Sequence, residues 1–421
     1  MSTSTVVNQD VNVYVLLVAC LIPLAVFFLG SQLFEKPFLS FQNIKDIIQG
    51  PTRILSNITP GHFSVERAAF SYETFLPFAM GEIRTMRASY QILGRAHKKI
   101  GYDLGYPAKL NKLEEVTVAN GRIADGILGL AKEEFRDELN YNIGSMRGDV
   151  GRVRETLKHF VRDWSAEGKV EREVIFQPIL DVLRQVPVES RPGMRVLVPG
   201  SGLGRLAWEI SELGFETVAI ELSYFMTLGL RFLLSPKTTE RINQHKVHPY
   251  ANWFSHTRAN SNIFRSVSFP DVVPRRTDTL HFLEGDFLKH DPSHIFSNSG
   301  SYDFVVTLFF IDTSLNIIST LEHIHSILRP GGTWINLGPL LWTSGGQTRM
   351  ELSLEEVFQL VERLGFVLDN GQTSSPSKTR QSTTDSSEVR QPRTIECEYT
   401  ADRTAMMSWI YKAEFWVATK V

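Results

Sequence analysis

Short apolar runs alternate with helical patterns from residue 195 to the end of the chain. Runs of this kind, with polar segments between them, are typical of strands buried in a parallel sheet. They lie at residues 196–198, 217–221, 280–283, 302–310 and 333–337, with a closing strand at 409–420. Amphipathic segments between them predict helices from residue 205 and over 315–328 and 353–364. This alternation predicts an α/β fold with a doubly wound, mostly parallel sheet.

The chain upstream of this sheet has a helical pattern instead. Apolar residues recur at helical spacing between about 65 and 140 and again over 153–164. We therefore predict a helical N-terminal region at 61–190, followed by a domain at 191–421. Residues 371–393 are rich in Ser, Thr, Gln and charge, which predicts a disordered insertion in that domain.

An uncharged apolar segment lies near the N-terminus, at residues 13–30, and its length is close to the minimum that spans a membrane. A cleaved signal peptide fits less well, because residues 1–12 contain no Lys or Arg, and a buried helix is a third interpretation. Basic residues follow the segment, which by the positive-inside rule predicts a cytosolic C-terminal part. We expect a short tail at 1–12, a single-pass transmembrane anchor at 13–30 in the endoplasmic reticulum membrane, and a linker at 31–60.

The composition excludes several classes of partner. The 421 residues carry a formal net charge of −2 and no basic stripe, so we expect no nucleic acid partner. Cys20 and Cys397 are the only cysteines, which are too few for a disulfide framework and fit a reducing compartment. The histidines lack the spacing of metal-binding motifs, so we expect no metal. The sequence leaves open whether the chain forms a homo-oligomer.

The turn after the first predicted strand carries the strongest chemical signal. Gly200, Gly202 and Gly204 let the backbone turn sharply and approach a ligand, and the next helix directs its N-terminal amides at the turn. Glu221 ends the following strand, where a carboxylate can accept hydrogen bonds from ribose hydroxyls. The spacing G-x-G-x-G differs from the dinucleotide fingerprint and favours S-adenosylmethionine over a pyrophosphate-bearing cofactor. A purely structural glycine turn is the alternative.

Other candidate residues lie at strand ends and on one helix. In an open α/β sheet, ligands bind outside the carboxyl ends of the strands. Asp286 could accept from an adenine amino group and Phe287 could cover the ring, or the pair is a simple turn with a core aromatic. Asp312 is either a catalytic or substrate-binding carboxylate or a helix N-cap. Arg162, which neighbours His159 on its helix, is either a solvated charge or a clamp for a carboxylate.

Several stretches together resemble the carnosine N-methyltransferase family. They are residues 160–165 (FVRDWS), 198–209 (VPGSGLGRLAWE), 248–250 with 269–271 (HPY and FPD), 309–313 (FFIDT) and 330–341 (PGGTWINLGPLL). The similarity covers roughly residues 65–421, apart from the insertion. It implies a Rossmann-like class I methyltransferase fold. It also implies transfer of a methyl group from S-adenosylmethionine to a ring nitrogen of the histidine moiety of carnosine, giving anserine, or of a related histidine-containing dipeptide.

The resemblance also implies roles for individual residues. By position, S-adenosylmethionine would be held by Arg162, Gly200, Glu221, Asp286 and Phe287, and the glycine turn adds Gly202. Asp312 and Tyr411 would face the substrate as catalytic residues. One position on the cofactor side and one on the substrate side depart from the family. His159 stands where a glutamine beside the cofactor is common. Thr343 stands where a histidine that contacts the dipeptide is common.

The proposed chemistry is consistent with these roles. Neutral imidazole, with a pKa near ~6.5, has a free lone pair at neutral pH and can attack a sulfonium methyl without a strong base. A carboxylate that accepts the N–H of the other ring nitrogen would stabilise the developing charge, and Asp312 suits that role. Three alternatives stay open: a methyltransferase for histidine in peptides or proteins, a nucleotide-dependent oxidoreductase, and a non-catalytic membrane-tethered binding module.

Overall fold

Five helices precede the sheet in the computed structural model, which describes residues 61–139, 147–296, 301–342, 348–369 and 388–421. They are α3 (Val65–Gln91), α4 (Arg95–Asp103), α5 (Tyr106–Glu134), α6 (Val150–Trp164) and α7 (Lys169–Arg184). The side chain of Ser64 caps α3 by accepting from the N–H of Arg67, and Asp149 caps α6 in the same way. The helical pattern predicted for this part of the chain is therefore confirmed.

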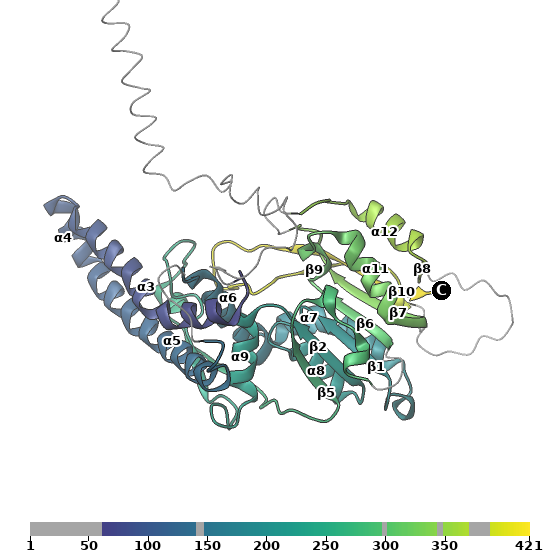
Figure 1. Cartoon of the computed structure of the whole chain (residues 1–421). Coiled ribbons are helices and arrows are strands. Elements are labelled where there is room, and N and C mark those ends of the chain that lie inside the picture. Colours follow the sequence, from purple (N-terminus) through teal and green to yellow (C-terminus); the bar gives the residue numbers. More distant parts are fainter. Residues whose placement is uncertain (1–60, 140–146, 297–300, 343–347, 370–387) are drawn as a thin grey trace, which may run out of the picture. The chain divides into compact units, whose positions relative to one another are not determined.

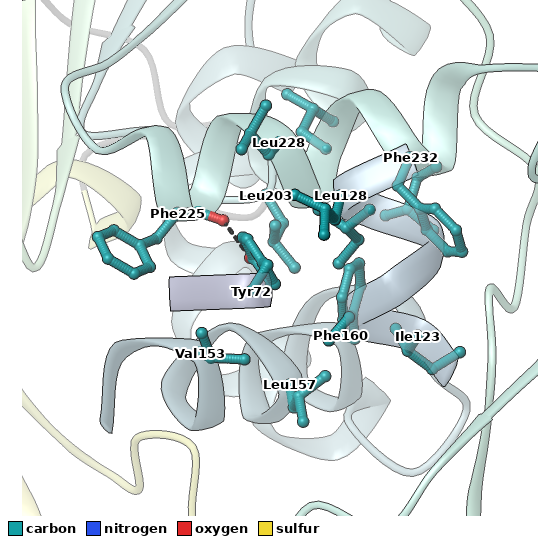
Figure 2. Packing of buried hydrophobic residues seen from close by; sticks show 14 of the residues in the cluster. Tyr72, Ile123, Leu128, Val153, Leu157, Phe160, Leu203, Phe225, Leu228 and Phe232 are labelled. Atoms are coloured by element: carbon teal, nitrogen blue, oxygen red, sulfur yellow. Dashed lines mark hydrogen bonds between the residues drawn. The ribbon is translucent and has the colours of Figure 1, made fainter. Parts of the chain in front are cut away.

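One apolar cluster joins the N-terminal helices to the sheet domain. Buried side chains from α3, α5 and α6 pack against those of α9 (Tyr224–Leu234), as Figure 2 shows for Tyr72, Phe160 and Phe225 among others. The Tyr72 hydroxyl donates to the Phe225 carbonyl at 2.7 Å, which satisfies the one polar group of that side chain inside the cluster. The helices and the sheet thus share a core, and the described residues from 61 onward form one compact unit.

The main sheet is mostly parallel, as predicted. Its strands are β1 (Arg195–Pro199), β2 (Glu216–Glu221), β5 (Leu280–Glu284), β6 (Tyr302–Leu308), β7 (Leu328–Gly338), β8 (Phe366–Leu368), β9 (Arg393–Cys397) and β10 (Tyr411–Lys420). The order is β5-β2-β1-β6-β7-β10-β8, with β9 also paired to β10 (Figure 1). Only β10 runs antiparallel to its neighbours β7, β8 and β9. The chain moves outward from β1 in both directions, which places the ligand site of such a sheet at the carboxyl end of β1.

Helices cover both faces of the sheet. Alternate residues of β1 point to opposite sides: Val196 and Val198 pack with α7 and α8 (Arg205–Glu212), whereas Leu197 packs with α11 (Ile317–Ile327) and α12 (Leu354–Arg363). A doubly wound sheet is the fold class that the sequence predicted. The connection after α9 forms a small antiparallel pair, β3 (His245–Val247) and β4 (Val267–Phe269), with α10 (Asn260–Ile263) between them. We call residues 235–276 the β3–β4 insertion.

The prediction that the fold includes a transmembrane helix is wrong as far as the structure extends. Among the described residues, no helix combines the length and the apolar character that a membrane crossing requires. The two longest, α3 and α5, carry charged side chains along their length and bury one face against the rest of the protein. The segment for which the span was predicted, 13–30, lies outside the described residues, as do the predicted tail and linker.

The predicted insertion at 371–393 needs a smaller correction. Residues 370–387 lie outside the described part, but Glu388–Arg390 form a 3₁₀ helix and β9 begins at Arg393. In β9, exposed and less exposed residues alternate, because one face of this edge strand meets solvent. The predicted insertion therefore overlaps this strand only at Arg393.

Candidate functional site

The glycine turn lies at the carboxyl end of β1, where the sheet topology places a ligand. Gly200, Gly202 and Gly204 have φ of +63°, +57° and +74°, a left-handed region that favours glycine. A Cβ on Gly200 or Gly204 would come within 2.6 Å of Phe310 or 2.8 Å of Phe282, so these two positions have no room for a side chain. A Cβ on Gly202 would meet only Nη2 of Arg162, at 4.0 Å. The space above Gly202 is therefore open and bordered by a cation.

Glu221 connects the end of β2 to this turn. Its Oε2 accepts from the N–H of Gly202 and its Oε1 from the N–H of Ser223, both at 2.8 Å. Desolvation raises the pKa of Glu221, although these backbone N–H groups partly offset it. Each carboxylate oxygen keeps a second lone pair, so the side chain can still accept from hydroxyl groups of a ligand.

Arg162 on α6 is a buried cation and not a solvated charge. Its Nε and Nη2 donate to the two carboxylate oxygens of Asp163 at 2.7 and 3.1 Å. Burial works against the charge, but the Asp163 carboxylate outweighs it and raises the pKa of Arg162 above its ordinary value. Arg162 therefore stays charged beside the open side of Gly202, as a clamp for an anionic group requires.

His159 lies one helical turn before Asp163, and its ring is also buried. Its Nδ1 is 3.7 Å from Asp163 Oδ2, too far for a hydrogen bond, and has no other partner in the described part of the chain. Burial, helped by the charge of Arg162, lowers the pKa of His159. The ring is therefore neutral at neutral pH.

A set of buried polar contacts holds the end of α6 against the glycine turn. The indole of Trp164 donates to the Leu203 carbonyl at 2.9 Å. Arg172 on α7 donates to the Arg162 carbonyl at 2.6 Å and to Asp271 of the β3–β4 insertion at 2.6 Å. The other oxygen of Asp271 accepts from Arg205 at the start of α8, also at 2.6 Å. Contacts with the glycine turn, with α7 and with the β3–β4 insertion thus fix the position of Arg162.

Asp286 and Phe287 have structural roles after β5. Asp286 Oδ1 accepts from the N–H of Leu288 at 3.0 Å and so caps a 3₁₀ turn. The Phe287 ring is buried and meets Phe310 and His323 edge-on, at centroid distances of 5.4 and 4.7 Å. This packing agrees with a turn followed by a core aromatic. Contacts of these two residues with a cofactor stay predictions.

Asp312 is not a helix N-cap. The side chain that caps α11 is that of Asn316, whose Oδ1 accepts from the N–H of Ile318 at 3.2 Å. Asp312 Oδ2 accepts instead from the N–H of Leu341 at 3.0 Å, across the segment that follows β7. Burial raises the pKa of Asp312, and the backbone N–H groups around it partly offset this. A buried carboxylate at the end of β6, without a capping role, fits a functional residue.

An aromatic cluster completes the site, and the sequence did not single out its central residue, Tyr399. The Tyr399 ring lies 4.7 Å from Phe309 and 6.4 Å from Tyr411, centroid to centroid, and 5.7 Å from His159. The guanidinium of Arg162 lies 4.7 Å from its centre. Tyr399 therefore connects the cluster to the groups around Gly202. Nothing in the local sequence marks it, because it occupies an irregular segment between two strands.

Phe309 has a strained backbone at the end of β6. Its φ is +50°, which is rare for a bulky residue, and its N–H donates to the Leu337 carbonyl at 2.8 Å. Such strain concentrates at functional sites, where the surrounding structure imposes it. Phe309 and Tyr411 also meet edge-on at 5.6 Å. The structure thus brings together His159, Arg162, Gly202, Glu221 and Tyr411 as predicted candidates, whereas Thr343 lies outside the described residues.

A cavity of about 630 Å³ lies elsewhere. It is lined by residues of α3, α4 and α5, among them Met86, Tyr90 and Tyr106, and by Asn260 of α10. None of the candidate residues borders it, and Lys109 is the only charged side chain that lines it. We therefore place the candidate site at the glycine turn, where the charged and aromatic groups converge.

Comparisons with known proteins show the family of the chain. Residues 140–421 match the family model described as carnosine N-methyltransferase. The chain is 32% identical over 330 residues to the carnosine N-methyltransferase of Mus musculus, covering 75% of this chain and 76% of the relative. It is also 32% identical over 355 residues to that of Schizosaccharomyces pombe, covering 79% and 88%.

A solved structure of low similarity is that of the magnesium protoporphyrin IX methyltransferase from Synechocystis with bound SAH. It is 14% identical with a TM-score of 0.33, covering 65% of this chain and 100% of that one. Similarity at this level says nothing about activity.

Proposed function

The chain belongs to the carnosine N-methyltransferase family, and from that premise we propose that it transfers a methyl group from S-adenosylmethionine to a ring nitrogen of the histidine moiety of carnosine or a related dipeptide. The observation that carries the proposal is that two groups of residues, which form the two halves of the site, meet at one place. Arg162, Gly202 and Glu221 form one half, and Tyr399 with Phe309 forms the other. A cofactor held by the first half would face a flat ring held by the second.

The cofactor half fits S-adenosylmethionine. The open side of Gly202 leaves space against the backbone that a side chain would fill. Arg162 would pair with the carboxylate of the amino-acid part, and Glu221 would accept from the ribose hydroxyls. The site offers no basic cradle for a pyrophosphate among these residues, which favours this cofactor over a dinucleotide. When bound, S-adenosylmethionine supplies a methyl group on a positively charged sulfur.

The substrate half fits a flat ring that becomes cationic. Tyr399 and Phe309 offer aromatic surfaces to a neutral imidazole, and the same surfaces attract a cation more strongly. They therefore stabilise the charged transition state better than the ground state, which is the condition for catalysis. The strained backbone of Phe309 indicates that the surrounding structure fixes this ring in place.

Asp312 would hold the reacting ring by its other nitrogen. The imidazole lone pair would attack the methyl carbon that the cofactor supplies, and the new C–N bond would form as the C–S bond breaks and leaves its electron pair on sulfur. The second ring nitrogen keeps its proton during this step, and the Asp312 carboxylate would accept that N–H. It would thereby fix the tautomer and offset the positive charge that develops on the ring.

Mass spectrometry of the full chain incubated with S-adenosylmethionine and candidate acceptors tests the proposal. Carnosine, free histidine and peptides with an internal histidine are the acceptors, and fragmentation locates the methyl group. We expect one added methyl on the imidazole ring of carnosine. Methylation of the peptides alone would reassign the enzyme to histidine in proteins, and no methylated product would refute the proposal.

A further inference from the structure

Two aromatic residues of the site lie close to the two ends of the segment between β9 and β10. Tyr399 lies just after β9 and Tyr411 is the first residue of β10, and residues 398–410 between the two strands form neither helix nor strand. We call residues 398–410 the substrate loop. Thr400, directly after Tyr399, has a φ of +50°, which is costly for a β-branched residue. A strained turn persists only where other contacts impose it, so contacts from the surrounding structure must hold this loop.

Arg265 of the β3–β4 insertion makes the densest set of these contacts. Its Nη2 lies 2.9 Å from Asp402 Oδ1 and donates to Glu167 Oε1 at 3.0 Å, and its Nη1 donates to Thr404 Oγ1 at 3.0 Å. Because Glu167 belongs to the segment between α6 and α7, one guanidinium joins three parts of the chain. Its side chain is only 19% exposed, so these ion pairs are less screened than those of a surface arginine.

The insertion also positions Arg265 before it meets the loop. The guanidinium lies 4.3 Å from the centre of the Tyr250 ring, and its Nη1 donates to the carbonyl of Asn262 at 2.9 Å, both within the insertion. The hydroxyl of Tyr250 donates to the carbonyl of Ala401 at 3.0 Å, beside the strained Thr400. Tyr250 thus packs against Arg265 and also binds the substrate loop directly.

A second contact holds the loop from the side of the helices. Glu171 on α7 is buried, and its Oε1 accepts from the N–H of Thr400 at 2.8 Å. Further along, the N–H of Met406 donates to the carbonyl of His256 at 2.7 Å. None of these contacts involves the glycine turn or Glu221, so the fixation of the loop is separable from the cofactor half of the site.

We propose that Arg265 is a positioning residue for the substrate. By holding Asp402 and Thr404 against the insertion, it keeps Tyr399 packed on Phe309 and Arg162, where the reacting ring would bind. This inference deepens the proposed function and rests on it. Arg265 itself touches none of the three site aromatics, Phe309, Tyr399 and Tyr411, so it acts through the loop and not by contact with the substrate.

The test compares Arg265→Gln with wild type and with Arg275→Gln in the full chain. Arg275 lies in the same insertion and donates to the carbonyls of Pro274 and Thr239, without contact to the substrate loop, so its variant controls for general damage to the insertion. For Arg265→Gln we expect the KM for carnosine to rise roughly tenfold, because the bound geometry of the ring is loosened. The Kd for S-adenosylmethionine, measured by calorimetry, should change less than about twofold, because the cofactor half keeps its contacts.

Arg265→Lys guards against a variant that fails to fold. Lysine keeps the charge but not the planar fork, so its KM should lie between those of wild type and Arg265→Gln. A wild-type KM in both Arg265 variants would overturn the inference. So would an equal loss of cofactor and carnosine affinity, because that would mean a structural role for Arg265 throughout the site.

Limited proteolysis separates this inference from the proposed function. Arg403 lies in the substrate loop, and trypsin cleavage after it should be roughly tenfold faster in Arg265→Gln than in wild type or Arg275→Gln, because a released loop opens more often. If wild type fails to methylate carnosine while this difference appears, the proposed substrate is wrong but the loop is held as described. If carnosine is methylated and neither KM nor cleavage changes, the inference fails and the function stands.

Discussion

The guanidinium of Arg162 lies 4.7 Å from the centre of the Tyr399 ring. This contact joins the two halves of the site, because Arg162 borders the open side of Gly202 and Tyr399 packs on Phe309. The cation and the ring attract each other, and both are held by further contacts, from Asp163 and from the turn at Thr400. The two halves are thus in contact but are held by different groups, and the following variants are chosen to separate their roles.

Arg162→Lys should weaken binding of S-adenosylmethionine by roughly 10- to 100-fold, the loss expected for a charged, two-pronged hydrogen bond. Lysine keeps the positive charge but cannot match a carboxylate with two parallel donors. Calorimetry on the purified variant measures the effect. Arg154→Lys is the matched control, because Arg154 lies on the same helix and pairs with Glu82 away from the site. A Kd within about twofold of wild type for Arg162→Lys would remove this residue from the cofactor site.

Gly202→Ala should abolish binding of S-adenosylmethionine while the protein stays folded. The added Cβ would occupy the open side of the turn, and the left-handed backbone costs about 1–2 kcal/mol with any side chain. Gly193→Ala is the control, because Gly193 also has a positive φ, of +84°, but no atom lies within 4 Å of a Cβ there. Both variants should melt at similar temperatures, and only Gly202→Ala should fail in equilibrium dialysis with labelled cofactor. Equal affinity in the two variants would show that the turn is structural.

The parallel sheet and the glycine turn could be predicted because their signals are local. Val196 to Val198 form an apolar run, and Gly200, Gly202 and Gly204 lie within five consecutive residues. The family resemblance pointed to Arg162 and Tyr411 for the same reason. Arg162 lies in an amphipathic predicted helix, and Tyr411 lies in the predicted closing strand.

The rest of the site depends on contacts between distant parts of the chain. Tyr399 lies in an irregular segment, and only the packing of the substrate loop on α6 brings it to Arg162. Asp312 looked like a possible cap in sequence, but its partner is the N–H of Leu341 and the cap is Asn316. The sequence likewise could not tell that Phe287 packs into the core, because a buried aromatic and a ligand-stacking one look alike in one dimension.

His159→Gln should make stability less sensitive to acid. Burial holds the pKa of His159 below its ordinary value, so below about pH 6.5 the unfolded chain binds a proton that the folded protein does not. The stability of wild type is therefore full above that pH and falls as the pH drops towards the lowered pKa. Glutamine cannot titrate, so the loss between about pH 7.5 and about pH 5.5 should be smaller in the variant. Urea unfolding at both pH values measures it, and an unchanged loss would contradict the neutral, buried state of His159.

Asp312→Asn should lose turnover and keep the fold. An amide has no charge to offset the forming imidazolium, and removal of one preorganised electrostatic contact typically costs ~10²–10³ in turnover. Asn316→Ala is the informative comparison, because Asn316 is the true cap of α11. That variant should lose about 1 kcal/mol of stability but keep its turnover per folded molecule. Four residues apart, the two changes are expected to have opposite effects.

The pH dependence of stability gives Asp312 a second, independent test. Burial holds its folded pKa above the ordinary value of an aspartate, so the folded protein binds the proton more tightly than the unfolded chain does. The stability linked to this group is therefore full below the unfolded pKa and is lost as the pH rises through the folded pKa. At neutral pH the ionised carboxylate thus lowers the stability of the folded protein, and Asp312→Asn removes this cost. The amide oxygen of the new side chain can still accept from the N–H of Leu341. The variant should melt at or above the wild-type temperature at neutral pH and should lose that advantage in acid. A variant that is inactive and clearly less stable at neutral pH would mean that Asp312 acts through the fold, and the search for the group that accepts the imidazole N–H would then move to Tyr411.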